Sequence, residues 1–119
     1  MFNDVKAFRE KFNLTYSGPP RNIPYAMRDD RFNHMMEELY EYYNARTKAD
    51  QLDALVDLVY VALGTAALHG FPFDEAWARV HAANMKKMRA ASAKDSKRND
   101  PYDVVKPPGW VPPDLTDLV

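Results

Sequence analysis

The stretch that decides the fold is ALVDLVYVALGTAAL, residues 54–68. It contains no proline, and its apolar residues fall on nearly every face of a helix, which predicts a helix packed on most of its sides. Asp57 is the only charged residue in this run. A buried carboxylate without a partner is costly, so Asp57 requires a counter-charge.

Asp53 lies one helical turn before Asp57 and shares its face. Two carboxylates stacked in this way repel each other unless a cation lies beside them, and a metal ion is the leading candidate. A structural interpretation of Asp57 also stays open. In that interpretation its carboxylate pairs with an arginine or accepts hydrogen bonds from a buried donor.

Composition limits the function classes. The chain has 119 residues, which suits one domain over residues 1–119, and its 16 basic and 17 acidic residues leave a net charge of -1. A chain with this balance has no excess of positive charge that would indicate binding to nucleic acid or to an anionic membrane. The absence of cysteine excludes disulfides, thiolate metal sites and cysteine nucleophiles.

The same features predict a cytoplasmic protein. The N-terminal sequence MFNDVKAFREKF carries acidic residues and lacks the apolar core of a signal peptide. The apolar run at residues 54–68 is shorter than the roughly 20 residues that a membrane span needs, and it contains Asp57.

Helical spacing of apolar residues predicts four helices. The first lies at the N-terminus and is followed by a proline-rich loop, so that both occupy residues 1–24. The second is expected at 29–46, the third at 50–69 with Gly70 as its C-cap, and the fourth from residue 73 or 74 to about 91. The apolar stripe expected on the second helix consists of Phe32, Met35, Met36, Leu39 and Tyr43. Trp77 and His81 of the fourth helix are expected in the core.

Residues 92–119 differ from the rest of the chain. Residues 92–100 are polar and charged, and five of the nine prolines lie between Pro101 and Pro113. This composition predicts an extended tail without regular structure. The fold class expected from the whole chain is an all-α bundle of about four helices with an extended C-terminal tail.

Two pairs of acidic residues form the candidate metal site: Glu38 and Glu41 on the second helix, Asp53 and Asp57 on the third. Antiparallel helices joined by a short link can bring both pairs to one place. Oxygen ligands of this kind suit Mg²⁺, with Mn²⁺ as the second possibility. Taken alone, the glutamate pair is equally compatible with a solvated helix face. A di-iron site requires Glu-x-x-His motifs, and none occurs.

The candidate substrate-binding residues lie in the last third of the chain. Asn84 occurs on the apolar face of the fourth helix, where a hydrogen-bonded core amide is the alternative, and Lys87 follows at the edge of that face. Basic residues of the tail can close over an anion, and the tail's one tryptophan can stack on a base or pack on the bundle. These tail residues are Lys97, Arg98, Lys106 and Trp110.

Three segments resemble a known family. EELYE (residues 37–41) followed by DALVDLVYVALGTA (residues 53–66) resembles the all-α nucleotide pyrophosphohydrolases, the MazG-like superfamily, which includes phosphoribosyl-ATP pyrophosphohydrolase and dimeric dUTPase. Its signature is Glu-x-x-Glu on one helix and Glu-x-x-Asp on the next. VHAANMKK (residues 80–87) resembles a phage and bacterial branch in which an Asn and a following Lys recur, and the proline-rich tail is similar to that of the same branch.

The resemblance assigns roles to particular residues. Glu38 and Glu41 match the first acidic pair, and Asp57 matches the final aspartate. The third acid departs from the pattern, because the signature places a glutamate at Ala54 whereas this chain has Asp53 one residue earlier.

The resemblance implies Mg²⁺-dependent hydrolysis of a nucleoside triphosphate between its α and β phosphates, giving a monophosphate and pyrophosphate. Glu38 or Glu41 would orient or deprotonate the attacking water, and Lys87 with the tail cations would neutralise the leaving pyrophosphate. It also implies a homodimer or homotetramer. Two alternatives stay open: phosphoribosyl-ATP or another nucleotide derivative as substrate, and a non-catalytic helical interaction module whose tail binds a partner.

Overall fold

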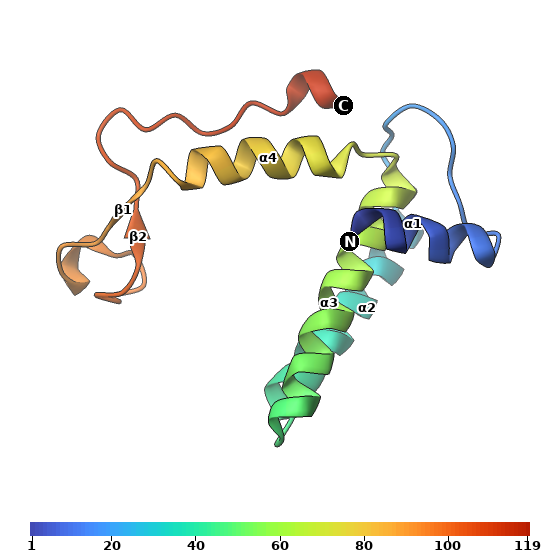
Figure 1. Ribbon diagram of the computed structural model, residues 1–119, viewed down its shortest axis with the longest axis horizontal. Coiled ribbons are helices and arrows are strands. Elements are labelled where there is room, and N and C mark those ends of the chain that lie inside the picture. Colours follow the sequence, from blue (N-terminus) through green and yellow to red (C-terminus); the bar gives the residue numbers. More distant parts are fainter. The chain divides into compact units, whose positions relative to one another are not determined.

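The computed structural model describes residues 1–119 and is built from four α-helices (Figure 1). These are α1 (Phe2–Lys11), α2 (Tyr25–Asn44), α3 (Lys48–His69) and α4 (Phe73–Asn84). The remaining elements are two short strands, β1 (Met88–Arg89) and β2 (Val104–Val105), and two 3-10 turns at Ala93–Asp95 and Thr116–Leu118. The predicted all-α fold class is confirmed. The chain divides into two compact units, residues 1–73 with 118–119 and residues 74–117.

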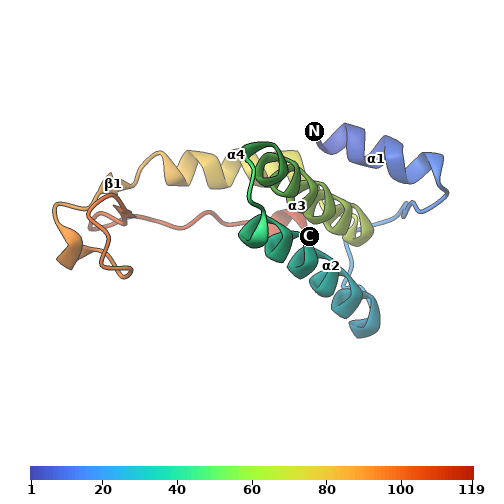
Figure 2. The same ribbon diagram turned by 90° about the horizontal axis from the view of Figure 1, so that it is seen from below.

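In the first unit, α2 and α3 form an antiparallel helical hairpin joined by a link of three residues, 45–47 (Figures 1 and 2). The Thr47 hydroxyl caps α3 by accepting a hydrogen bond from the Asp50 amide at 3.1 Å. Gly70 ends α3 in the left-handed conformation (φ 73°), as predicted from its position before Pro72. The short link fixes the register of the two helices, and that register places the candidate metal ligands.

The core of this unit lies between α1 and α3. Phe2 and Val5 of α1 are buried against Leu63 and Ala66 of α3, and Phe8 meets the Tyr60 ring edge-on with the centroids 5.4 Å apart. The apolar spacing of the N-terminal segment therefore predicted α1 correctly. Because α1 crosses only the C-terminal half of α3, it leaves much of that helix uncovered.

The predicted packing of α2 and α3 is wrong for the single chain. Leu52 is 64% exposed and Val56 54% exposed, so α3 is not packed on most of its sides. On α2, Phe32, Leu39 and Tyr43 of the predicted apolar stripe are exposed, and Met35 and Met36 are only partly buried, so the stripe forms no core within the single chain. The hairpin of the single chain therefore exposes a large apolar surface.

The apolar run at residues 54–68 is too short to span a membrane, but α3, the helix that contains it, is longer. The helix has 22 residues and is apolar enough to cross a bilayer by length and composition, a test that the core helix of a soluble protein also passes. Helix α2 runs along α3, and Asp57 lies near the middle of α3 beside the acidic residues Glu38 and Glu41.

In the second unit, α4 ends at Asn84, earlier than the predicted end near residue 91. The chain then enters β1, which pairs with β2 in antiparallel orientation and brings Met88 opposite Val105. The predicted helix is thus wrong at Met88–Arg89, and the predicted tail without regular structure is wrong at Val104–Val105. Trp77 is 60% exposed and His81 is also exposed, so neither belongs to the core that the sequence predicted.

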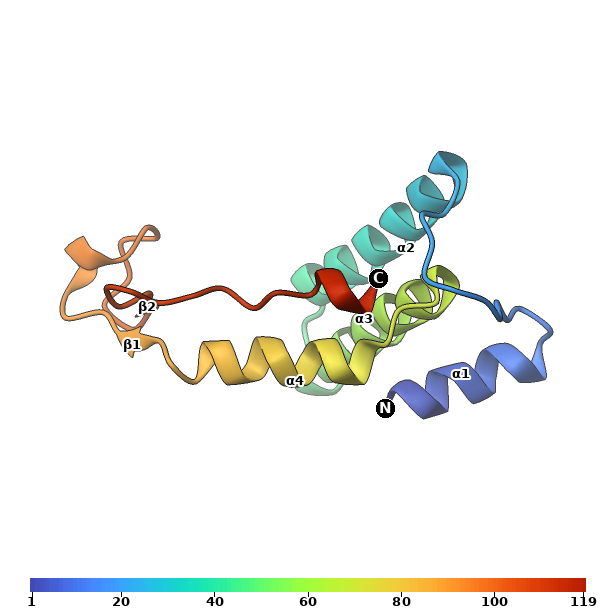
Figure 3. The same cartoon turned by 90° about the horizontal axis from the view of Figure 1, so that it is seen from above.

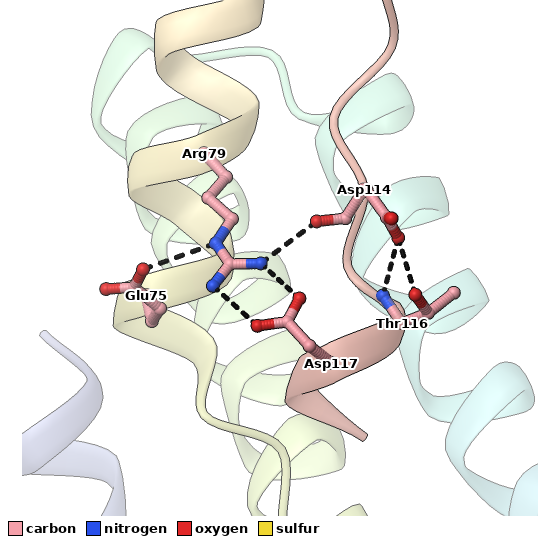
Figure 4. A network of polar contacts seen from close by, with 5 residues as sticks. All are labelled: Glu75, Arg79, Asp114, Thr116 and Asp117. Atoms are coloured by element: carbon pink, nitrogen blue, oxygen red, sulfur yellow. Dashed lines mark hydrogen bonds and ion pairs between the residues drawn. The ribbon is translucent and has the colours of Figure 1, made fainter.

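The C-terminal segment of this unit runs back alongside α4 (Figure 3) and is held there by Arg79. The Arg79 guanidinium forms a two-pronged ion pair with the Asp117 carboxylate, donates to the Asp114 carbonyl oxygen at 3.0 Å and contacts Glu75 at 3.3 Å (Figure 4). The Thr116 amide and hydroxyl both donate to the Asp114 carboxylate, at 2.9 and 2.7 Å. Arg79 therefore links the segment to α4.

We expect Arg79→Ala to loosen the C-terminal segment without unfolding α4. The contacts of Arg79 are solvent-exposed, so the effect should be small: amide hydrogen exchange at Thr116 and Asp117 should accelerate by about two- to fivefold. Exchange measured by mass spectrometry or NMR tests this, with the exposed Arg28→Ala as control. Unchanged exchange in Arg79→Ala would show that the segment is held by other contacts.

Candidate functional site

Three carboxylates converge between α2 and α3. Glu38 and Glu41 are three residues apart on α2, and Asp57 comes from α3; one ligand oxygen of each lies within 4.8 Å of the others. They meet because Glu38 lies on the partly buried face of α2, which is turned toward α3. The hairpin thus builds the acidic cluster that the sequence predicted for these three residues.

Glu38 is the least exposed member of the cluster. Its side chain is only 13% exposed, its Oε2 is buried without a hydrogen-bond partner, and its Oε1 lies 3.6 Å from His34 Nε2. Burial raises the pKa of Glu38 to about 7. A hydrogen bond that only the protonated carboxyl can share with Glu41, and the negative charges of Glu41, Asp57 and Glu37, act in the same direction. The cluster is therefore short of positive charge.

A hard divalent cation fits this donor set. All three ligands are carboxylate oxygens, which Mg²⁺ and Mn²⁺ prefer, and the cation would supply the partner that Glu38 Oε2 lacks. Ligand atoms on opposite sides of one Mg²⁺ lie about 4.2 Å apart, given Mg–O distances of about 2.1 Å. A separation within 4.8 Å therefore needs only small rotations of the side chains. Glu41 is exposed, so the site is open to water and substrate.

Asp53 lies outside the cluster of three. It is exposed on α3, one turn nearer the link than Asp57, and a ligand role for it stays a prediction. Asp53, at which the sequence departs from the family signature, is thus also the acidic residue that lies outside the cluster.

The predicted substrate-binding residues of the last third belong to the second unit. There the ammonium groups of Lys87 and Lys106 each lie 5.1 Å from the centre of the Trp110 ring, and the Trp110 indole donates to the Ala83 carbonyl oxygen at 2.7 Å. Arg98 forms an ion pair with Asp103 at 3.0 Å. Asn84 and Lys97 are exposed. Three of the predicted residues, Lys87, Lys106 and Trp110, are thus brought together, and Asn84 adjoins them at the end of α4.

A cavity of about 260 Å³ adjoins the acidic cluster within the first unit, and it has one acidic and one basic part. Glu38, Asp57 and His34 contribute to its lining, and so do Arg9 of α1 and Arg31 of α2. The sequence-based analysis missed both arginines. A signal was available for Arg31, which lies two helical turns before Glu38 and so on the same face of α2; for Arg9 there was none.

The raised pKa of Glu38 predicts a pH-dependent effect of metal on stability. Because its pKa in the folded protein lies above the usual value of 4.5, the metal-free fold favours protonated Glu38. Protonated Glu38 therefore adds to the free energy of unfolding of the metal-free protein. This stabilisation is fully present below the usual pKa and is lost as the pH rises through about 7. A cation competes with that proton, so the rise in Tm on adding Mg²⁺ should grow between about pH 5 and about pH 8.

Thermal unfolding in EDTA and in excess Mg²⁺ across that range tests this expectation, with Glu38→Gln as the matched variant. The variant should lose the pH dependence of the Mg²⁺ effect, since it carries no proton to displace. A Mg²⁺ effect that is the same at both ends of the range would contradict the assignment of Glu38 as a ligand.

Comparison with known proteins agrees with this geometry. The family model described as phosphoribosyl-ATP pyrophosphohydrolase matches residues 5–84, from α1 to the end of α4. The matched region contains the three clustered carboxylates and both arginines of the cavity, and it ends before the strands and the proline-rich tail. A search of the curated proteins finds no match.

Proposed function

The chain belongs to the phosphoribosyl-ATP pyrophosphohydrolase family, and from this premise we propose that it hydrolyses a nucleoside triphosphate between the α and β phosphates in a Mg²⁺-dependent reaction. As a member it is a nucleotide-derivative pyrophosphohydrolase, a hydrolase of acid anhydrides, which decides against the non-catalytic interaction module. The observation that carries the proposal is the convergence of Glu38, Glu41 and Asp57 on one point inside the matched region.

We assign different roles to the three carboxylates according to their exposure. Glu38 and Asp57, both partly buried, are the proposed metal ligands, and the exposed Glu41 is the residue that can also reach a water molecule. Bound Mg²⁺ supplies charge neutralisation at the phosphate oxygens and lowers the pKa of a coordinated water. Mn²⁺ offers the same ligand chemistry and is the expected substitute.

In the proposed reaction Glu41 accepts a proton from the attacking water. The water oxygen forms a bond to the α phosphorus, and the bond between that phosphorus and the bridging oxygen breaks. The electron pair of the broken bond leaves with pyrophosphate, and the nucleoside monophosphate is the other product. Asn84, Lys87, Lys97, Arg98, Lys106 and Trp110 stay predicted substrate contacts.

The substrate has two leading candidates. Phosphoribosyl-ATP is favoured by the name of the matching family, and simple ribo- or deoxyribonucleoside triphosphates are favoured by the sequence resemblance to the phage and bacterial branch. Both present the same α–β anhydride to the acidic cluster, so the choice between them depends on the base and sugar and not on the metal site.

Comparison of kcat/KM for phosphoribosyl-ATP with those for the eight common triphosphates, in Mg²⁺, decides between the two substrates. We expect one of them to exceed the others by at least about tenfold, the discrimination that one matched polar contact provides. Failure to cleave any of them would contradict the proposal.

We also propose that the active protein is a homodimer or homotetramer. The supporting observation is the apolar surface left by the single chain: Leu55, Val56 and Val59 with Met1 line a groove of about 400 Å³ on α3. A second groove of about 420 Å³ on α2 is lined by Leu39 and three tyrosines with Met36. A second copy of the chain supplies matching apolar faces and completes the core.

A further inference from the structure

Two arginines from different helices converge on Gly64 of α3. A Cβ atom at Gly64 would lie 3.1 Å from Arg31 Nη2 and 3.5 Å from Arg9 Nη1. Arg31 belongs to α2 and Arg9 to α1, so all three helices of the first unit contribute to this point. The absence of a side chain at Gly64 allows both guanidinium groups to lie against the helix.

Neither guanidinium has an anionic partner. The four ion pairs of the chain involve other residues, and none places a carboxylate within 4.0 Å of Arg9 or Arg31. Arg9 Nε donates to the Leu14 carbonyl oxygen, and Arg31 donates to the Thr65 hydroxyl and the Val61 carbonyl oxygen, each at 3.0 Å. These neutral acceptors hold the two groups in position without neutralising their charge.

The two cations also act on each other. Burial lowers the pKa of Arg9, and the pKa of Arg31 is lowered first by burial and then by the nearby charge of Arg9. Two partly buried positive charges that repel each other are an arrangement that a bound anion relieves.

The position of this pair relative to the acidic cluster identifies the anion. Arg9 and Arg31 line the same cavity as Glu38 and Asp57. An anion at the basic part is therefore close to a metal held at the acidic part. The cavity of about 260 Å³ is smaller than the roughly 300–1,000 Å³ of pockets that enclose a drug-sized ligand, so it accommodates part of a nucleotide. The phosphate chain is the part with the matching charge.

We propose that Arg9 and Arg31 bind the β and γ phosphates of the substrate, the part that leaves as pyrophosphate, and that Gly64 is required to let both guanidinium groups reach it. This inference rests on the proposed function, and it adds to the site two cations that the sequence did not reveal. Guanidinium groups suit this task because their fixed N–H groups match phosphate oxygens in pairs.

Calorimetric titration with inorganic pyrophosphate, in EDTA and in Mg²⁺, tests the proposal without turnover. Arg9→Gln and Arg31→Gln should each weaken pyrophosphate binding by about 10–100-fold, the usual value of a charge-assisted contact. Arg28→Gln, an exposed arginine on the same helix as Arg31, should bind as the wild type does. Inorganic phosphate should bind more weakly than pyrophosphate, because it can contact only one of the two arginines well.

Gly64→Ala separates an anion-binding role from a purely structural one. Alanine favours a helix over glycine, so this variant should be at least as thermally stable as the wild type in the absence of ligand. Its Cβ pushes the guanidinium groups away, so it should nevertheless bind pyrophosphate several-fold more weakly. A structural role for the arginines predicts no such loss.

Wild-type affinity in both glutamine variants, or no pyrophosphate binding by the wild type in either condition, would overturn the inference. If Arg31→Gln does not fold by circular dichroism, Arg31→Met, which also removes the charge, replaces it, and unchanged affinity there has the same meaning. The proposed function fails separately: arginine-dependent pyrophosphate binding without cleavage of any nucleotide would retain the anion site and remove the reaction. Conversely, both arginine variants could cleave the nucleotide with wild-type KM and bind pyrophosphate with wild-type affinity. That result would retain the reaction and remove the anion site.

Discussion

Asp57→Asn is expected to reduce Mg²⁺-dependent pyrophosphate release by at least about 100-fold, which is the upper range for residues that only support a metal ligand. Asp57 is the one carboxylate that α3 contributes to the cluster of three, so its loss leaves the metal held from α2 alone. Asparagine keeps the size of the side chain, and the helical content of the protein should not change. Steady-state assays and circular dichroism on the same preparation measure both quantities.

Asp53→Asn is the matched control for this experiment. It makes the same chemical change on the same helix one turn away, at an exposed position outside the cluster. We expect an effect of less than about fivefold there, because no ligand is removed. Wild-type activity in Asp57→Asn would exclude Asp57 from the mechanism, and loss of helicity would favour a structural role. A loss in Asp53→Asn as large as in Asp57→Asn would show that Asp53 replaces the family's third acid.

The second large effect is expected at the exposed apolar face of α3. Val56→Arg should convert the proposed oligomer into a monomer, because it replaces an apolar contact of about 1.5–3 kcal/mol in each subunit with a charge that would be buried unpaired. Association should weaken by more than about 100-fold. Light scattering coupled to size-exclusion chromatography, over a range of protein concentrations, reports the change directly.

Val111→Arg is a suitable control for the oligomer experiment. Val111 is more exposed than Val56 and lies in the proline-rich tail, which belongs to the other unit. The Val111→Arg substitution should leave the oligomeric state unchanged. A wild-type protein that is monomeric at every concentration would contradict the proposed assembly, and so would a Val56→Arg variant that assembles like the wild type.

The sequence predicted the helices and the convergence of three carboxylates. Apolar spacing located α1, and the pairing of Gly70 with Pro72 located the end of α3. The three-residue spacing of Glu38 and Glu41, together with a short link to the next helix, correctly placed them near Asp57. These features follow from local geometry, which a single sequence records.

Other features depend on contacts between distant segments. The stripe containing Phe32 is predicted to be a core face by its periodicity, yet Phe32, Leu39 and Tyr43 are exposed in the single chain, because the face containing Glu38 packs on α3. Arg9 and Arg31 become neighbours only when α1 and α2 both meet α3 at Gly64. The strands β1 and β2 have two residues each, too few to produce an alternating pattern.

The most direct test of the central claim is the identity of the product formed from nucleoside triphosphates and phosphoribosyl-ATP in the presence and absence of Mg²⁺. We expect pyrophosphate and the corresponding monophosphate to appear in equal amounts in Mg²⁺ and neither to appear in EDTA. Release of orthophosphate in place of pyrophosphate, or pyrophosphate release that persists in EDTA, would contradict a metal-dependent pyrophosphohydrolase built on Glu38, Glu41 and Asp57.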